Sequence, residues 1–315
     1  MQSRRYPQVS RARRGFSLAE ILISMTVAMV VIAGATSFSM QSWKTRRNWT
    51  LRETVDRDAR FVGLSLARDV QEAGIAMTST PVFASMDTRG DTISVLSVPF
   101  LPNEAVVYPI YNDGDTLPTY PAGGTCGATC IDFQKVGGTY ELVAGDLVKL
   151  QVGSTRRLLM LTSVANRSTT LFRVNFLNVK TLAGRPSGLD SLRLMRSGSS
   201  IQKLNIYMYW RDAAKQQLMR AEKLNTSGVP VGAVMANQVE QFQARLLFVT
   251  GTEHPTYSGV DADTTNDGND IIGMKVRAKI KSQRSDPAVN DGVPVSRWYE
   301  WKMAPRNLLY EKNRM

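Results

Sequence analysis

The chain has 315 residues, 43% of them hydrophobic, and a formal net charge of +12 at pH 7. Five arginines precede residue 16, so the rest of the chain carries a net charge of +7, which is 12 − 5. A basic protein attracts anionic lipid or nucleic acid, but the region beyond residue 77 contains no arginine run interleaved with aromatic residues and no nucleic-acid motif. No specific nucleic-acid partner is therefore expected. The sole histidine, His254, stands without a nucleophile elbow, phosphate loop or HExxH motif, which argues against an enzyme.

A long apolar segment covers residues 16–38 and carries a single charged side chain, Glu20. As a helix, this segment would rise about 34 Å at roughly 1.5 Å per residue, enough to cross a hydrocarbon core of about 30 Å. A carboxylate near one end of a spanning helix costs on the order of a few kcal/mol when it faces lipid, so Glu20 needs a cation or another helix. The sequence therefore predicts one membrane span with a partner for Glu20.

The residues around the start of this segment have a distinctive order. Residues 13–20 read Arg-Arg-Gly-Phe-Ser-Leu-Ala-Glu, so a basic leader and Gly15 are followed by Phe16, with Glu20 as the fifth residue after the glycine. This string resembles the class III signal of type IV pilins and of the pseudopilins of type II secretion. The resemblance implies that prepilin peptidase cuts between Gly15 and Phe16 on the cytoplasmic side and N-methylates Phe16. The new amine would lie in the same membrane layer as Glu20 of a neighbouring subunit and pair with it.

Two other interpretations of this region stay open in the sequence. Residues 33–35, Ala-Gly-Ala, could serve as the small-residue cleavage site of a secretory signal peptide, although the apolar run is longer than usual and contains a carboxylate. The segment could also be an uncleaved anchor in which Glu20 has no role. Only the class III signal predicts assembly.

Apolar residues continue beyond the span at steps of three or four, the spacing of one face of an amphipathic helix. They are Leu51, Val55, Ala59, Val62, Leu66, Val70 and Ala73. No proline interrupts residues 16–77, and Gly74 provides a stop signal. The pattern predicts one long helix, with residues 16–38 in the membrane and residues 39–77 packed by their apolar face against a head.

From residue 78 to 315 the sequence consists of short β-rich runs separated by turn residues, which is typical of an antiparallel sheet. The expected strands are 92–98, 146–152, 157–164, 170–176, 203–211, 217–223, 239–249, 272–280 and 297–303. The predicted fold class is α+β: a long N-terminal helix, transmembrane then amphipathic, packed on a β-rich periplasmic head after a leader of residues 1–15. Pilins have this layout.

Two features of the head suggest local bonds. Cys126 and Cys130 are the only cysteines, and outside the cytoplasm they are expected to form a disulfide, because they match neither a CxxC redox motif nor a closed zinc site. Asp261, Asp263 and Asp267 lie in an acidic stretch that could hold calcium. A polar turn is the competing interpretation, since an EF-hand loop starting at Asp263 would place methionine where glutamate is needed.

The order of the head elements, from residues 67–74 through strands at 239–245 and 274–280 to a closing Arg306-Asn307, resembles PilW-type minor pilins and, in layout, the J-type minor pseudopilins of type II secretion. The resemblance implies a subunit of the priming or tip complex of a type IV pilus. Its partners would be other minor pilins, the major pilin, the pilus assembly machinery and a tip adhesin. It would sit in the inner membrane by one pass until incorporated into the cell-surface pilus. There are two alternatives. The chain could be a minor pseudopilin of a type II secretion system, or it could be a basic surface protein that captures DNA or presents an adhesin.

Overall fold

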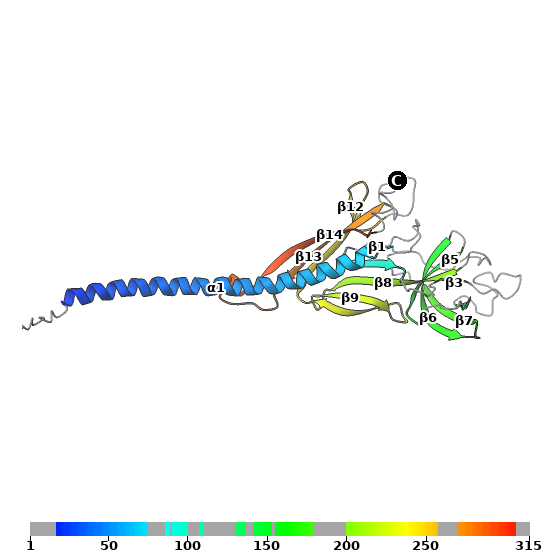
Figure 1. The fold of residues 1–315 in the computed structure, drawn as a ribbon, viewed down its shortest axis with the longest axis horizontal. Coiled ribbons are helices and arrows are strands. Elements are labelled where there is room, and N and C mark those ends of the chain that lie inside the picture. Colours follow the sequence, from blue (N-terminus) through cyan, green and yellow to red (C-terminus); the bar gives the residue numbers. More distant parts are fainter. Residues whose placement is uncertain are drawn as a thin grey trace, which may run out of the picture.

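One long helix carries a β-rich head at its C-terminal end in the computed structural model of this chain (Figure 1). The structure describes residues 17–74, 86–88, 90–99, 107–109, 130–135, 141–152, 155–178, 200–257 and 270–306. Helix α1 (Leu18–Gln71) is continuous over 54 residues. Its N-terminal part projects away from the head, and its C-terminal part packs into it (Figure 1). The predicted α+β fold class, a long helix on antiparallel sheets, is confirmed.

Two antiparallel sheets make up the described part of the head. The larger sheet has ten strands, β1 (Met86–Thr88), β2 (Thr92–Ser97), β3 (Val107–Pro109), β4 (Cys130–Gln134), β5 (Leu147–Val152), β6 (Thr155–Asn166), β7 (Leu171–Asn178), β8 (Ser200–Asp212), β9 (Gln217–Leu224) and β10 (Pro230–Ala236). Its main order is β1-β2-β8-β5-β6-β7-β4, with β3 and β9 also paired to β8, and β10 paired to β9. The smaller sheet has the order β12-β11-β13-β14, formed by β11 (Val239–Phe248), β12 (Glu253–His254), β13 (Ile271–Lys281) and β14 (Ser296–Met303).

All nine strands expected from the sequence are present, with ends that differ by at most three residues. Five further strands, β1, β3, β4, β10 and β12, were not predicted. Three of these have only two or three residues, too short for an alternating pattern. Strand β10 shows no clear alternation of buried and exposed side chains, and all but one of its residues are exposed or half-buried. It is held mainly by its pairing with β9.

Helix α1 ends earlier than the expected boundary at residue 77. The last helical residue is Gln71, and the amide of Glu72 still donates to the carbonyl of Arg68 at 3.2 Å. Gly74 then takes a left-handed conformation with φ of 76°, which a glycine adopts without steric cost. Its amide donates to the carbonyl of Leu96 in β2 at 2.9 Å. The glycine stop expected from the sequence is thus confirmed, and it ties the helix end to the larger sheet.

Strand β8 joins the two parts of the larger sheet. Residues 200–204 pair with β5 and partly with β3, whereas residues 205–212 pair with β2 and β9. The half of the sheet beyond β5 has its own core, which includes Phe133, Leu150 and Phe172. The half near β2 and β9 packs with α1 and the smaller sheet. One strand therefore runs through both parts of the head.

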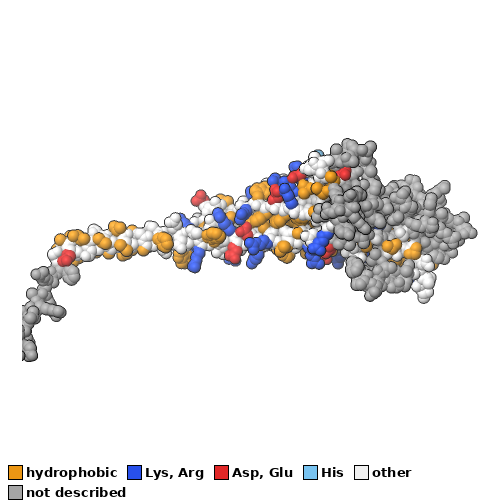
Figure 2. All heavy atoms as spheres, turned by 45° about the horizontal axis from the view of Figure 1, so that its top comes forward, with side chains coloured by type: hydrophobic (Ala, Val, Ile, Leu, Met, Phe, Trp, Pro, Cys, Tyr) orange, Lys and Arg blue, Asp and Glu red, His pale blue; other side chains and the backbone are white. Residues whose placement is uncertain are grey.

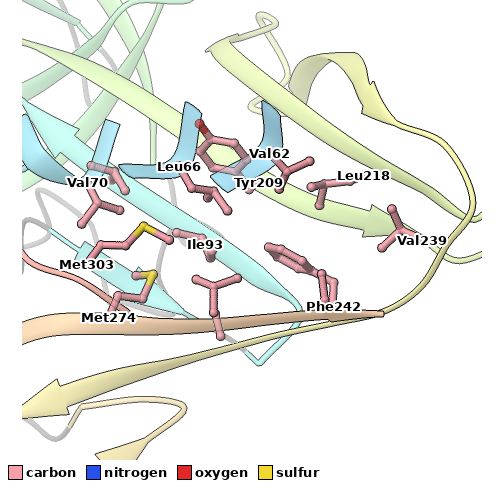
Figure 3. Close-up of a cluster of buried hydrophobic side chains, with 14 of the residues drawn as sticks. Val62, Leu66, Val70, Ile93, Tyr209, Leu218, Val239, Phe242, Met274 and Met303 are labelled. Atoms are coloured by element: carbon pink, nitrogen blue, oxygen red, sulfur yellow. The ribbon is translucent and has the colours of Figure 1, made fainter. Parts of the chain in front are cut away.

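The apolar stripe of α1 forms the centre of the main core. Val55, Ala59, Val62, Leu66, Val70 and Ala73 are each at most 2% exposed, as the spacing predicted. Leu51, the first residue of the predicted face, is only half-buried. In Figure 3, Val62, Leu66 and Val70 lie among side chains from both sheets, which include Ile93 of β2, Tyr209 of β8, Leu218 of β9, Phe242 of β11, Met274 of β13 and Met303 of β14. Each buried valine or leucine contributes on the order of 1.5–3 kcal/mol. The C-terminal part of α1 is therefore a core element of the head.

A polar cluster lies within this apolar contact. The Asp69 side chain, 2% exposed, accepts hydrogen bonds from the Tyr209 hydroxyl and from Arg220 Nε at 2.8 Å, and it forms an ion pair with Arg220 Nη2 at 2.8 Å. The Arg220 guanidinium also lies 5.0 Å from the centre of the Tyr207 ring. Burial, followed by the hydrogen bond to Asp69, raises the pKa of Tyr209. The cluster fixes how α1 sits on β8 and β9.

Strand β14 contacts α1 closely at Gly63. A Cβ atom on Gly63 would lie 2.3 Å from Nε1 of Trp301 and 2.9 Å from two other atoms of that ring. Two turns earlier on the helix, Asp56 accepts a hydrogen bond from the Tyr299 hydroxyl and another from Arg297 Nη1 at 3.3 Å. Gly63 therefore provides the space in which the Trp301 ring packs on the helix.

We expect Gly63→Ala to lower the free energy of unfolding by about 1–3 kcal/mol, the usual range for overpacking. Alanine in an unobstructed helix interior would instead stabilise by roughly 0.5–1 kcal/mol. Urea unfolding of the detergent-solubilised full chain, followed by tryptophan fluorescence, measures the difference. Gly34→Ala is the matched control, because nothing lies within 4 Å of its added methyl group. A stabilised Gly63→Ala protein would contradict the close contact.

Candidate functional site

The N-terminal half of α1 presents its apolar side chains to the surroundings. Every residue from 17 to 47 is exposed, and Glu20 is the only charged one between residues 17 and 43. Figure 2 shows hydrophobic side chains along this part of the helix, with charged ones gathering where the helix meets the head. In the described part of the chain, this is the one helix long and apolar enough to cross a membrane, with a mean hydropathy of 2.2 over its best window.

The first turn of α1 is built around Ser17 and Glu20. Ser17 is the N-cap residue, and its Oγ accepts a hydrogen bond from the Glu20 amide at 3.2 Å. The Ser24 hydroxyl in turn donates to the Glu20 carbonyl at 2.7 Å. A serine three residues before a glutamate is the sequence pattern of a capping box, and a carboxylate in the first turn is favoured by the helix dipole. The position of Glu20 in the first turn therefore suits its carboxylate to the helix start as well as to pairing with another subunit, and the sequence analysis missed this.

Residues 10–36 match the family model of the prokaryotic N-terminal methylation motif. The chain thus carries the N-terminal signal of a protein that is processed like a type IV pilin or pseudopilin, and the apolar half of α1 together with this signal indicates membrane anchoring. No curated protein and no solved structure matches the chain. The resemblance of residues 13–20 to this signal is confirmed, whereas the narrower resemblance to PilW-type or J-type proteins stays a prediction.

The methylation motif includes the expected cleavage point. Gly15 and Phe16 lie outside the described residues, which begin at Ser17 directly after them. Of the residues predicted to act in processing and assembly, the structure thus places Glu20 alone, exposed on the first turn. The cut itself and the methylated amine remain predictions.

The other residues singled out in the sequence lie mostly outside the described part. Cys126 does, and so do Asp261, Asp263 and Asp267, while for Cys130 only its backbone pairing with Asn175 is described. The disulfide and the calcium site therefore stay predictions. Met274, which would close an EF-hand loop begun at Asp263, is fully buried in the main core. Among the described residues, no group of three or more histidine, cysteine, aspartate or glutamate side chains could hold a metal ion.

Charged side chains of both signs cover the outer face of the smaller sheet. Lys275 pairs with Glu253 at 2.9 Å, Arg277 with Glu300 at 2.6 Å, and Lys279 with Glu240 at 2.8 Å. The hydrogen bond from Arg277 lowers the pKa of Glu300, so this carboxylate stays charged. Alternating signs do not form the cationic track that a nucleic-acid backbone requires. His254, at the edge of the same sheet, is exposed and meets the Phe248 ring edge-on at 6.0 Å.

Proposed function

We propose that this chain is a minor pilin of a type IV pilus, a structural subunit of the priming or tip complex that initiates pilus assembly. Prepilin peptidase removes residues 1–15, and Phe16 becomes the methylated N-terminus. The protein then sits in the inner membrane by one pass, with its head in the periplasm, until the assembly machinery moves it into the pilus beside other minor pilins and the major pilin.

The observation that carries this proposal is that the apolar half of α1 is exposed and lies largely within the methylation motif of residues 10–36. An apolar helix that stands free of its own head can bury its surface first in lipid and later among equivalent helices of a filament. Glu20 is the sole charge on the segment that would pack there. A methylated amine of Phe16 on a neighbouring subunit would supply the cation that this carboxylate needs in an apolar layer.

The size of the head favours a rare subunit over the main building block. The helix carries a head of two sheets, with one hydrophobic core shared by α1 and both sheets and a second core in the half of the larger sheet beyond β5. A head this large packs awkwardly at every position of a thin fibre but fits at its end. The same features suit a minor pseudopilin of a type II secretion system, and co-purification of the chain with the subunits of one system or the other separates these two.

Mass spectrometry of the N-terminal peptide, on protein recovered from membranes, tests the processing step. We expect N-methylphenylalanine at Phe16, because Phe16 directly follows Gly15 in the stretch that resembles the class III signal. A terminus just after Ala35 would indicate a secreted protein, and an intact Met1 would indicate a permanent anchor. Either of these two results would contradict the proposed function.

A further inference from the structure

The connection between β13 and β14, residues 282–295, is a compact loop that lies alongside α1 (Figure 1). Its base is closed by Ser282, whose amide donates to the Val295 carbonyl at 2.8 Å and whose Oγ accepts from the Val295 amide at 3.1 Å. Farther along the loop, the Asp286 carboxylate accepts from the Ala288 amide at 2.9 Å. Loops of this kind, closed at the base and ordered within, are frequently functional.

The loop is bound to the helix beyond the apolar segment. Arg47 Nη1 donates to both carboxylate oxygens of Asp286, at 3.1 and 3.3 Å. The same guanidinium lies 5.8 Å from the centre of the Trp43 ring. Asp286 thus holds the loop against α1 and orients Arg47 next to Trp43.

A crevice of about 330 Å³ lies between the loop and the helix. It is lined by Ser39, Met40, Trp43, Lys44 and Arg47 of α1 and by Ala288 of the loop. Trp43 is 64% exposed, and Lys44 has no ion-pair partner among the residues that the structure describes. The crevice therefore combines an apolar floor with two cations, of which one is unpaired.

The position of the crevice along α1 sets its depth in a membrane. Its first lining residue, Ser39, directly follows the apolar segment of residues 16–38, which is long enough to fill the hydrocarbon core. Tryptophan is enriched at the level of the lipid headgroups, and lysine and arginine reach the phosphates with their long side chains. Trp43, Lys44 and Arg47 would therefore lie at that level, in the leaflet nearer the head.

We propose that this crevice binds an anionic phospholipid while the protein is anchored in the membrane, an inference that rests on the single-span placement in the proposed function. The Lys44 ammonium and the Arg47 guanidinium bind the phosphate and the charged headgroup. Met40, Trp43 and Ala288 contact the glycerol and the upper part of an acyl chain. Anionic lipid satisfies both the charge and the apolar surface of the crevice, which a free phosphate ion does not. The bound lipid holds the loop, and with it the head, at a fixed height above the bilayer.

Quenching of Trp43 by brominated lipids tests the proposal. The full chain carries Trp49→Phe, so that Trp43 is the reporter nearest the bilayer, and it is placed in nanodiscs of phosphatidylcholine with a minor fraction of phosphatidylglycerol. Bromine is carried by one lipid or the other at the same mole fraction. The leader arginines precede the span, so any anionic lipid that they attract is in the opposite leaflet. Trp43 follows the span and therefore reports on the leaflet next to the head. We expect the brominated phosphatidylglycerol to quench Trp43 several-fold more strongly than the brominated phosphatidylcholine.

Two variants and a control connect this preference to the crevice. Lys44→Gln is expected to weaken the preference about fivefold, the effect of one cation near an anionic surface, and Ala288→Leu to abolish it by filling the crevice without a change in charge. Lys223→Gln, an exposed lysine on β9, should leave it unchanged. Equal quenching by the two lipids, or a preference that survives both variants, would overturn the inference and leave the proposed function intact. A chain that does not enter nanodiscs would overturn both.

Discussion

Replacing Glu20 with alanine is expected to abolish incorporation of the chain into a filament while leaving its membrane insertion unchanged or improved. The carboxylate costs on the order of a few kcal/mol in lipid, so its loss favours insertion. The same change removes the anion that we propose to pair with the Phe16 amine of a neighbour. Immunoblotting of sheared filaments and of membrane fractions measures the two effects separately.

A second variant is required, because Glu20→Ala also removes a carboxylate that the helix dipole favours in the first turn. Glutamine is equally suited to the third position of a capping box but carries no charge. Glu20→Gln should therefore fail in assembly as completely as Glu20→Ala if the charge is what matters. Glu53→Ala, which removes an exposed carboxylate from α1 beyond the apolar segment, is the matched control and should assemble normally. Filaments that contain Glu20→Gln at the normal level would exclude the proposed pairing.

Replacing Asp69 with alanine is expected to lower the free energy of unfolding by about 3 kcal/mol, the lower end of the range for breaking a buried ion pair. The variant leaves the Arg220 guanidinium and the Tyr209 hydroxyl without their shared acceptor. The Arg220 side chain is 23% exposed, so water can hydrate part of it and the loss stays near that lower end. Urea unfolding of the detergent-solubilised full chain measures the change.

A matched control separates this effect from the general loss of a carboxylate on α1. The Asp58 carboxylate lies 3.8 Å from Arg57, whose side chain is 78% exposed, and such surface pairs contribute about 0–1 kcal/mol. Asp58→Ala should therefore change the free energy of unfolding by less than about 1 kcal/mol. Asp69→Asn should fall between the two, because its amide oxygen still accepts a hydrogen bond. An Asp69→Ala protein as stable as Asp58→Ala would show that the cluster does not hold the helix on the sheet.

The elements that the sequence predicted are those whose pattern is local. The stripe of α1 repeats every three or four residues, and β13 alternates fully buried and mostly half-buried side chains along most of its length, so each could be assigned from its own residues. Strand β3 has three residues and exists because the start of β8 lies beside it, which no local pattern indicates. Strand β10 also depends on a residue that is distant in the sequence. It contains Gly232, and the Trp210 ring of β8 fills the space where a Cβ of this glycine would be.

The polar contacts of the site divide in the same way. The capping pattern of Ser17 and Glu20 spans three residues and could have been recognised from the sequence, although it was missed. Asp69 and Arg220 are separated by 151 positions, so their pairing required the fold. One signal was present: Asp69 follows Leu66 by three residues, which places a carboxylate on the apolar face of the helix and implies a buried partner. The crevice at Trp43 gave no such signal, because Ala288 reaches it from a distant loop.

The depth at which α1 enters the head determines how the protein responds to tension. A force applied through the apolar half of the helix acts along the helix axis. It is therefore parallel to the surface on which residues 55–73 pack against the two sheets. Such a load shears all the buried contacts of that stretch at once, and it does not peel them apart one after another. The rate of forced detachment is then set by the barrier to breaking the whole interface together. The head of this protein is thus attached to its helix in the orientation that best withstands pulling from the membrane side.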